Sequence, residues 1–86
     1  MSKFDKLVQK VLSGSSDRNI DFNDLCGLLE TLGFDNRIKG SHHIYYKEKI
    51  PEIINLQPAG KKAKAYQVKQ VRELLIKYKL ISSKDE

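Results

Sequence analysis

The sequence is poor in several residue types, and each shortage excludes a class of protein. Its single cysteine, Cys26, cannot form a disulfide within the chain, and in a helical pattern it is expected to be a small buried hydrophobe. With only two histidines, no spacing of His, Cys and carboxylate residues is typical of a metal site. No apolar run approaches the roughly 20 residues that span a bilayer, and the start, "MSKFDKLVQK", lacks the apolar stretch of a secretory signal. We therefore expect a one-domain cytoplasmic protein without a membrane segment, a metal or a small-molecule cofactor.

Acidic residues are scarce in the second part of the chain. The net charge of the whole sequence is +5. Residues 1–36 carry four Lys/Arg against six Asp/Glu, whereas residues 37–86 carry twelve against five, a balance of +7. This asymmetry predicts an anionic partner for the second part. Nucleic acid is the first candidate, because clustered Lys and Arg neutralise phosphates; a basic surface that only meets solvent is the alternative.

Hydrophobic periodicity predicts two helices in the first part of the chain. Apolar residues at i, i+3, i+4 and i+7 predict an amphipathic helix with Ser2 as its N-cap, followed by a serine-rich linker. The second helix is expected to begin at the N-cap Asp21 and to end at Gly33 in the left-handed conformation. Within it, Gly27 costs helix stability, and we expect it to allow a close packing partner.

From Phe34 onward the pattern is typical of strands. Three short segments rich in aromatic and β-branched residues predict an antiparallel meander: 34–40, 41–47 and 51–57. Residues 58–65 predict a basic loop, and residues 66–80 a final helix. The order helix, helix, three strands, helix predicts an α+β domain, with helices on one face of a three-stranded antiparallel sheet.

Three motifs together resemble the HicA-type toxins: a helix that ends in "LGF", the pattern Arg-x-x-Gly-Ser-His, and a terminal helix of the "QVKQVRELL" type. The resemblance implies the fold of a double-stranded-RNA-binding domain, to which this chain adds an N-terminal helix. It divides the chain into an N-terminal helix and linker, an RNA-cleaving domain and a polar tail, at 1–19, 20–81 and 82–86. Where many family members end the last helix with a glycine, this chain has Lys79.

The resemblance also implies a function. HicA-type toxins are endoribonucleases that cleave mRNA (mRNA interferases) in type II toxin–antitoxin pairs, and a HicB-type antitoxin restrains them. The family's catalytic histidine follows the Gly-Ser pair, which places it at His42. RNA carries its own nucleophile, the 2′-OH, so a histidine that titrates near neutral pH need only act as a general base. We therefore expect metal-independent cleavage, and the alternative is a non-catalytic RNA-binding module of the same fold.

The residues beside His42 have two interpretations each. On a regular strand His43 faces away from His42, so we expect it to be packed. Tyr45 and Tyr46 either pack in the sheet or stack on an unpaired base. Gly40 either forms a tight turn or lets a phosphate approach the backbone.

Polar and basic residues around the motif are candidates for RNA binding. Ser41 can donate a hydrogen bond to a phosphate or to the backbone. Arg37 and Lys39 can stabilise charge in the transition state, or they can simply be exposed strand ends. The segment "PAGKKAKA" before the final helix is basic, and a helix N-terminus favours anions. We therefore expect this segment to anchor phosphates through Lys61, Lys62 and Lys64.

Overall fold

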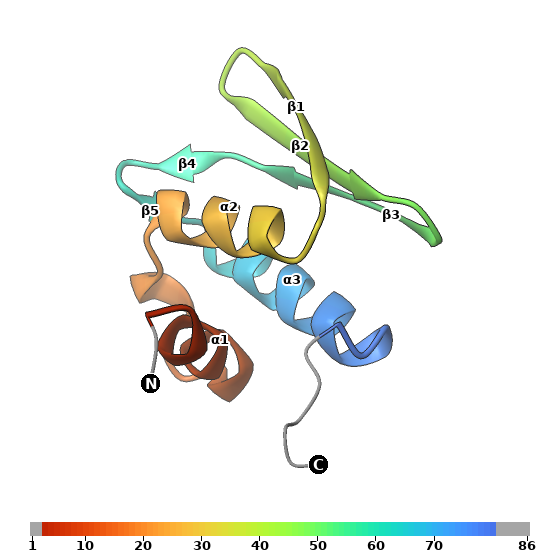
Figure 1. The fold of residues 1–86 in the computed structure, drawn as a ribbon. Coiled ribbons are helices and arrows are strands. Elements are labelled where there is room, and N and C mark those ends of the chain that lie inside the picture. Colours follow the sequence, from red (N-terminus) through yellow and green to blue (C-terminus); the bar gives the residue numbers. More distant parts are fainter. Residues whose placement is uncertain (1–2, 81–86) are drawn as a thin grey trace.

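The computed structural model describes residues 3–80 (Figure 1). Its elements are, in order, α1 (Lys3–Ser13), the short 3-10 helix η1 (Asp17–Asn19), α2 (Phe22–Thr31), β1 (Asp35–Lys39), β2 (His42–Lys47), β3 (Ile50–Leu56), β4 (Pro58–Ala59), β5 (Lys62–Ala63) and α3 (Ala65–Lys77). The expected N-cap Ser2 and the polar tail at 82–86 lie outside the described residues. No helix within 3–80 is long and apolar enough to cross a membrane.

The three longer strands form one antiparallel sheet in the order β1-β2-β3. Figure 1 shows α2 and α3 on one face of this sheet, while the β1–β2 hairpin extends beyond the helices. The α+β class, the meander and the additional N-terminal helix are therefore confirmed. The helix-covered face is called the inner face below, and the opposite one the outer face.

The expected basic loop at 58–65 is wrong in detail, because it folds into the small β4–β5 hairpin. Gly60 has φ +65 in its turn, a conformation that glycine adopts without steric cost. The hairpin is also tied to the chain before α2. The Phe22 N–H donates to the Lys61 carbonyl at 2.9 Å, and the Ala63 N–H donates to the Ile20 carbonyl at 2.9 Å. Distant backbone partners, rather than local propensity, therefore make this segment extended.

The core lies between the inner face of the sheet and the helices. Along β2 and β3 the side chains alternate, so Tyr45, Ile54 and Leu56 are almost fully buried. The helices α2 and α3 supply Leu and Val residues, and Cys26 is buried among them as expected. Helix α1 adds Val8 and Val11 to the same core, so it packs onto the domain.

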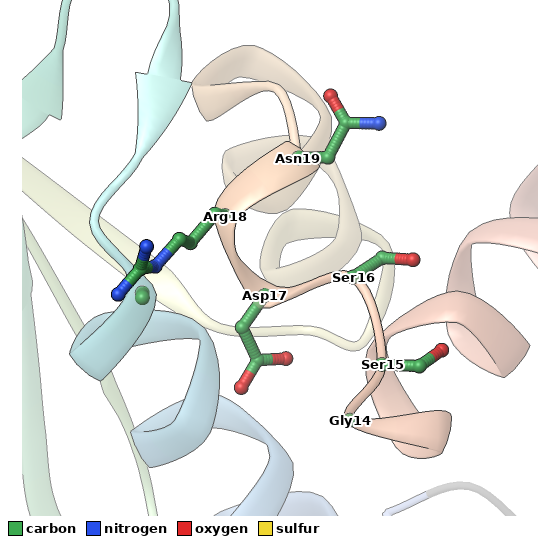
Figure 2. A pocket seen from close by; sticks show the side chains of 7 residues that line it. Gly14, Ser15, Ser16, Asp17, Arg18 and Asn19 are labelled. Atoms are coloured by element: carbon green, nitrogen blue, oxygen red, sulfur yellow. The ribbon is translucent and has the colours of Figure 1, made fainter.

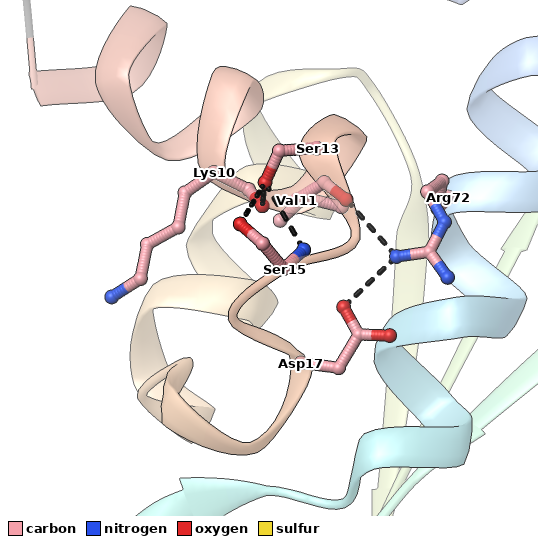
Figure 3. A network of polar contacts seen from close by, with 6 residues as sticks. All are labelled: Lys10, Val11, Ser13, Ser15, Asp17 and Arg72. Carbon is pink, nitrogen blue, oxygen red and sulfur yellow. Dashed lines mark hydrogen bonds and ion pairs between the residues drawn. The ribbon is translucent and has the colours of Figure 1, made fainter.

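One arginine connects α3 to the linker after α1 (Figure 3). Arg72 Nη1 donates to the Val11 carbonyl at 3.2 Å and to Asp17 Oδ1 at 2.9 Å. Gly14 ends α1 with φ +73, and a Cβ on it would lie 3.3 Å from the same guanidinium. Glycine is therefore required there both by the backbone conformation and by the close approach of Arg72.

One expectation about α2 is wrong, and the N-cap position of Asp21 is confirmed without its capping hydrogen bond. A Cβ on Gly27 would meet nothing within 4 Å, so no neighbour packs closely there; Gly27 instead borders a hollow beside α1. Asp21 stands at the N-cap position, but its side chain makes no capping hydrogen bond. Its carboxylate instead accepts from Lys62 Nζ at 3.1 Å, because β5 lies beside this helix end. Gly33 does adopt the expected left-handed conformation, with φ +94.

Helix α3 is fastened to β3 near both of its ends. Near its start, the Gln67 side chain hydrogen-bonds the backbone at the end of β3. At its C-terminal end, Glu52 accepts from Lys77 Nζ at 2.7 Å and from the Tyr78 hydroxyl, and these donors lower the pKa of Glu52 to about 2. Lys79 follows with φ +52, so a lysine adopts the left-handed conformation that glycine supplies in many family members.

Candidate active site

The two adjacent histidines of β2 lie on opposite faces of the sheet. His43 faces inward, and its ring packs edge-on against Phe22 with centroids 4.9 Å apart and planes at 82°. The expectation that His43 is packed is therefore confirmed. His42 faces outward and is exposed. Strand alternation thus separates a structural histidine from one that can meet a ligand.

The β1–β2 register places the two basic residues of β1 on the same face as His42. Lys39 lies directly opposite His42, and Arg37 lies directly opposite Ile44. Directly opposed residues of an antiparallel pair project from the same face, so all three side chains share the outer face. Arg37 and Lys39 are exposed. Two basic side chains of β1, a strand that also carries Asp35, therefore lie on the face of His42; β1 is called the basic strand below.

Gly40 and Ser41 form the two-residue turn of this hairpin. Gly40 has φ +64, and glycine at the first turn position is typical of a type II′ hairpin turn. A Cβ on Gly40 would meet nothing within 4 Å, so backbone conformation alone explains the glycine here. The turn sets the register that pairs Lys39 with His42. Binding of phosphate by Gly40 or Ser41 stays a prediction.

Two amide side chains that the sequence reasoning missed hold the His42 ring. Asn55 Oδ1 lies 3.2 Å from His42 Nδ1, and Gln57 Nε2 lies 3.3 Å from His42 Nε2. An amide oxygen can only accept and an amide nitrogen can only donate. The Nδ1–H tautomer satisfies both contacts, because Nδ1 then donates to Asn55 and the lone pair on Nε2 accepts from Gln57. The one signal in the sequence was the alternation of Asn55 and Gln57 with the apolar Ile54 and Leu56.

The three lysines expected to bind phosphates lie on and after the β4–β5 hairpin. Lys61 is exposed in the turn, and Lys64 is the N-cap residue of α3. Lys62 is already paired with Asp21. The structure thus brings all three lysines to the segment before α3 but leaves Lys62 less available to an anion. Their role in RNA binding stays a prediction.

The outer face also carries a shallow groove beside the basic strand. Arg37, Ile44, Tyr46 and Ile53 line it, and Tyr46 is 39% exposed. Tyr45 is 1% exposed on the inner face and donates its hydroxyl to Glu30 Oε2 at 3.1 Å. Burial raises the pKa of Tyr45, so its phenol stays protonated and continues to donate. Tyr45 is therefore a packing residue, and of these two tyrosines Tyr46 is the one available for base stacking.

Two other features of the described residues do not contribute to this site. A second hollow, formed by 14–19 and Ala65, surrounds the serine-rich linker, and no residue of the His42 site lines it (Figure 2). Burial raises the pKa of the Cys26 thiol, so Cys26 is kept in the unreactive thiol form. Within residues 3–80 no three His, Cys, Asp or Glu side chains cluster as metal ligands.

The fold and the outer-face histidine define a small α+β protein with the helix–three strands–helix arrangement of a double-stranded-RNA-binding domain. Comparison with protein families agrees with this class. Residues 22–77 match the family described as the HicA toxin of bacterial toxin–antitoxin systems. Because this match covers well over half of the sequence, the chain belongs to the HicA toxin family. No curated protein and no solved structure showed a significant match. Helix α1 and η1 lie before the matched range.

Proposed function

We propose that this protein is the toxin component of a type II toxin–antitoxin pair, and that it cleaves mRNA with His42 as its general base. Family membership supports the activity, since HicA toxins are mRNA interferases. The observation that carries the assignment is the exposed imidazole of His42, which is held by Asn55 beside the basic strand β1. The RNA-cleaving domain proposed at 20–81 includes every residue of this site.

The proposed reaction needs no nucleophile from the protein. His42 Nε2 takes the proton of the ribose 2′-OH, and the 2′ oxygen then attacks the adjacent phosphorus. The bond from phosphorus to the 5′ oxygen of the next nucleotide breaks, and that oxygen takes up a proton from solvent. The products are a 2′,3′-cyclic phosphate and a 5′-hydroxyl end. Arg37 and Lys39 offset the negative charge that gathers on the phosphate oxygens.

The substrate contacts follow from the charge and shape of the outer face. RNA lies across this face with a base in the groove at Tyr46, and phosphates beyond the sheet reach Lys61 and Lys64 on and after the β4–β5 hairpin. A HicB-type antitoxin would cover the same face, because acidic groups on it would complement the basic strand. Co-expression with such an antitoxin is expected to give a stable complex that does not cleave RNA.

One experiment tests the chemistry directly. The purified protein is incubated, in excess chelator, with an RNA whose cleavage sites have been mapped. A second RNA carries a single deoxynucleotide on the 5′ side of one scissile phosphate. We expect cyclic phosphate ends and no cut at the deoxy position, while the other sites are cut as before. Cutting at the deoxy position at an undiminished rate would overturn the mechanism, since it would require water as the nucleophile.

A further inference from the structure

Gln67 in α3 is the one buried polar side chain within residues 3–80, and it is 2% exposed. A buried amide is costly unless its hydrogen bonds are made. Both ends of this amide have a partner on β3 or directly after it. Gln67 Nε2 donates to the Asn55 carbonyl at 3.0 Å, and Gln67 Oε1 accepts from the Gln57 N–H at 3.2 Å. The same Nε2 lies 3.4 Å from the Tyr66 hydroxyl.

These two bonds follow the pattern of a β-ladder. A residue of a parallel strand bonds the carbonyl of one residue and the N–H of the second residue after it. The Gln67 amide bonds residues 55 and 57 in this way. β3 is an edge strand, so its backbone groups that point away from β2 have no strand to pair with. The Gln67 amide therefore takes the place of a neighbouring strand beside the backbone of Asn55 and Gln57.

The backbone that Gln67 holds carries the side chains that hold His42. Asn55 accepts from Nδ1 of the ring, and Gln57 donates to Nε2. A displacement of this backbone would move both amides relative to the imidazole. The tautomer of a histidine is set by the hydrogen bonds of its two nitrogens. Such a displacement would therefore let the His42 ring populate both tautomers.

We propose that Gln67 is a positioning residue, which acts through Asn55 and Gln57 to hold His42 as the Nδ1–H tautomer before RNA arrives. This inference rests on the proposed function for its catalytic consequence, but not for its structural part. In the free protein Gln57 occupies the lone pair of Nε2. The substrate 2′-OH replaces Gln57 there and meets a nitrogen that is already unprotonated. Asn55 stays in place and stabilises the imidazolium that forms.

The first test measures the tautomer without RNA. Nitrogen-15 NMR of the ring nitrogens, at a pH where the imidazoles are neutral, gives the Nδ1–H fraction of His42. We expect Nδ1–H to dominate in the wild type and a mixed population in Gln67→Met, whose side chain has a similar length but no amide. Gln70→Met is the matched control, because Gln70 lies in the same helix and makes no described hydrogen bond to β3. A dominant Nε2–H tautomer in the wild type would overturn the proposal, whatever the protein does to RNA.

A second pair of variants keeps the test decisive if Gln67→Met does not fold. Asn55 is exposed, so neither Asn55→Leu nor Asn55→Asp disturbs the core. Asn55→Leu removes the acceptor and is expected to give a mixture of the two tautomers. Asn55→Asp retains an acceptor and is expected to keep Nδ1–H dominant. Equal tautomer fractions in these two variants would show that Asn55 does not set the proton position.

The kinetic test connects this positioning with cleavage. Misplacement of a catalytic group by about 1 Å can cost about a hundredfold in rate. We therefore expect Gln67→Met to lower kcat by about tenfold to a hundredfold with little change in KM, while Gln70→Met cleaves at the wild-type rate. If Gln67→Met releases the tautomer without a fall in kcat, the catalytic part of the proposal is wrong. If the wild type does not cleave RNA at all, the proposed function fails, and the tautomer measurement still decides the structural part.

Discussion

The two faces of the three-stranded sheet use the same alternation of side chains for opposite purposes. On the inner face Tyr45, Ile54 and Leu56 are buried under α2 and α3. On the outer face Tyr46 and Ile53 are exposed beside His42 and the basic residues of β1. Neighbouring residues of one strand therefore serve either the core or the site. Changes on the inner face should affect folding, and changes on the outer face should affect RNA.

The largest expected effect comes from the two adjacent histidines. His42→Ala removes the proposed base and should lower the cleavage rate by about 10²–10⁴-fold. Its unfolding free energy should change by less than about 0.5 kcal/mol, because the side chain is exposed. His43→Ala removes the ring that packs on Phe22 and should cost about 0.5–1.5 kcal/mol of stability while cleavage persists. Single-turnover cleavage and urea unfolding measure both quantities; a His42→Ala protein that cleaves normally would remove the basis of the site assignment.

Two apolar residues of β3 test the same contrast on stability. Leu56 is 0% exposed and Ile53 is 59% exposed. Leu56→Ala leaves a cavity in the core and should cost about 2–5 kcal/mol of unfolding free energy. Ile53→Ala should cost no more than about 0.5 kcal/mol. Urea denaturation midpoints at a constant m-value give the comparison, and equal losses for the two variants would contradict the division between the faces.

Tyr46 tests whether the outer groove receives a base. Stacking of one base on an aromatic ring is worth about 1–3 kcal/mol, so Tyr46→Ala should weaken RNA binding by that amount. Tyr46→Phe is the matched control, because it keeps the ring and should bind as the wild type does. Fluorescence anisotropy with a labelled single-stranded RNA measures the affinity. Unchanged binding by the alanine variant would show that RNA does not enter the groove.

The smallest expected effect concerns the lysines before α3. Lys61→Ala and Lys64→Ala should each lower the slope of log affinity against log salt by about 0.7 on single-stranded RNA. Lys62→Ala should lower it less, because Asp21 already neutralises this lysine. Binding titrations over a series of salt concentrations give the three slopes. A larger change for Lys62 than for the other two would mean that RNA displaces Asp21.

The local sequence pattern was sufficient to predict much of the fold of this protein. Segments rich in aromatic and β-branched residues correctly predicted the sheet, and strand alternation correctly predicted that His43 is packed on the face opposite His42. The left-handed turn at Gly33 was predicted because few other residues accept that backbone conformation. These features depend on residues close together in the chain, so their physical causes can be read from the sequence.

The parts that were missed depend on partners far apart in the chain. Asn55 and Gln57 lie 13 and 15 residues from His42, and Lys62 lies 41 residues from Asp21. The same holds for β4–β5, whose extended backbone is held by bonds to the segment before α2. No local propensity indicates such pairs, because strand register and helix packing decide which side chains meet.

The sequence by itself therefore determined the order of the longer helices and strands, the family and the position of the candidate histidine on a strand. Only the tertiary structure decided how that histidine is held. The docking of α3 on β3 brings the buried Gln67 amide to the backbone of Asn55 and Gln57. The physical reason is the cost of an unpaired buried amide, which makes the helix position and the strand edge depend on each other.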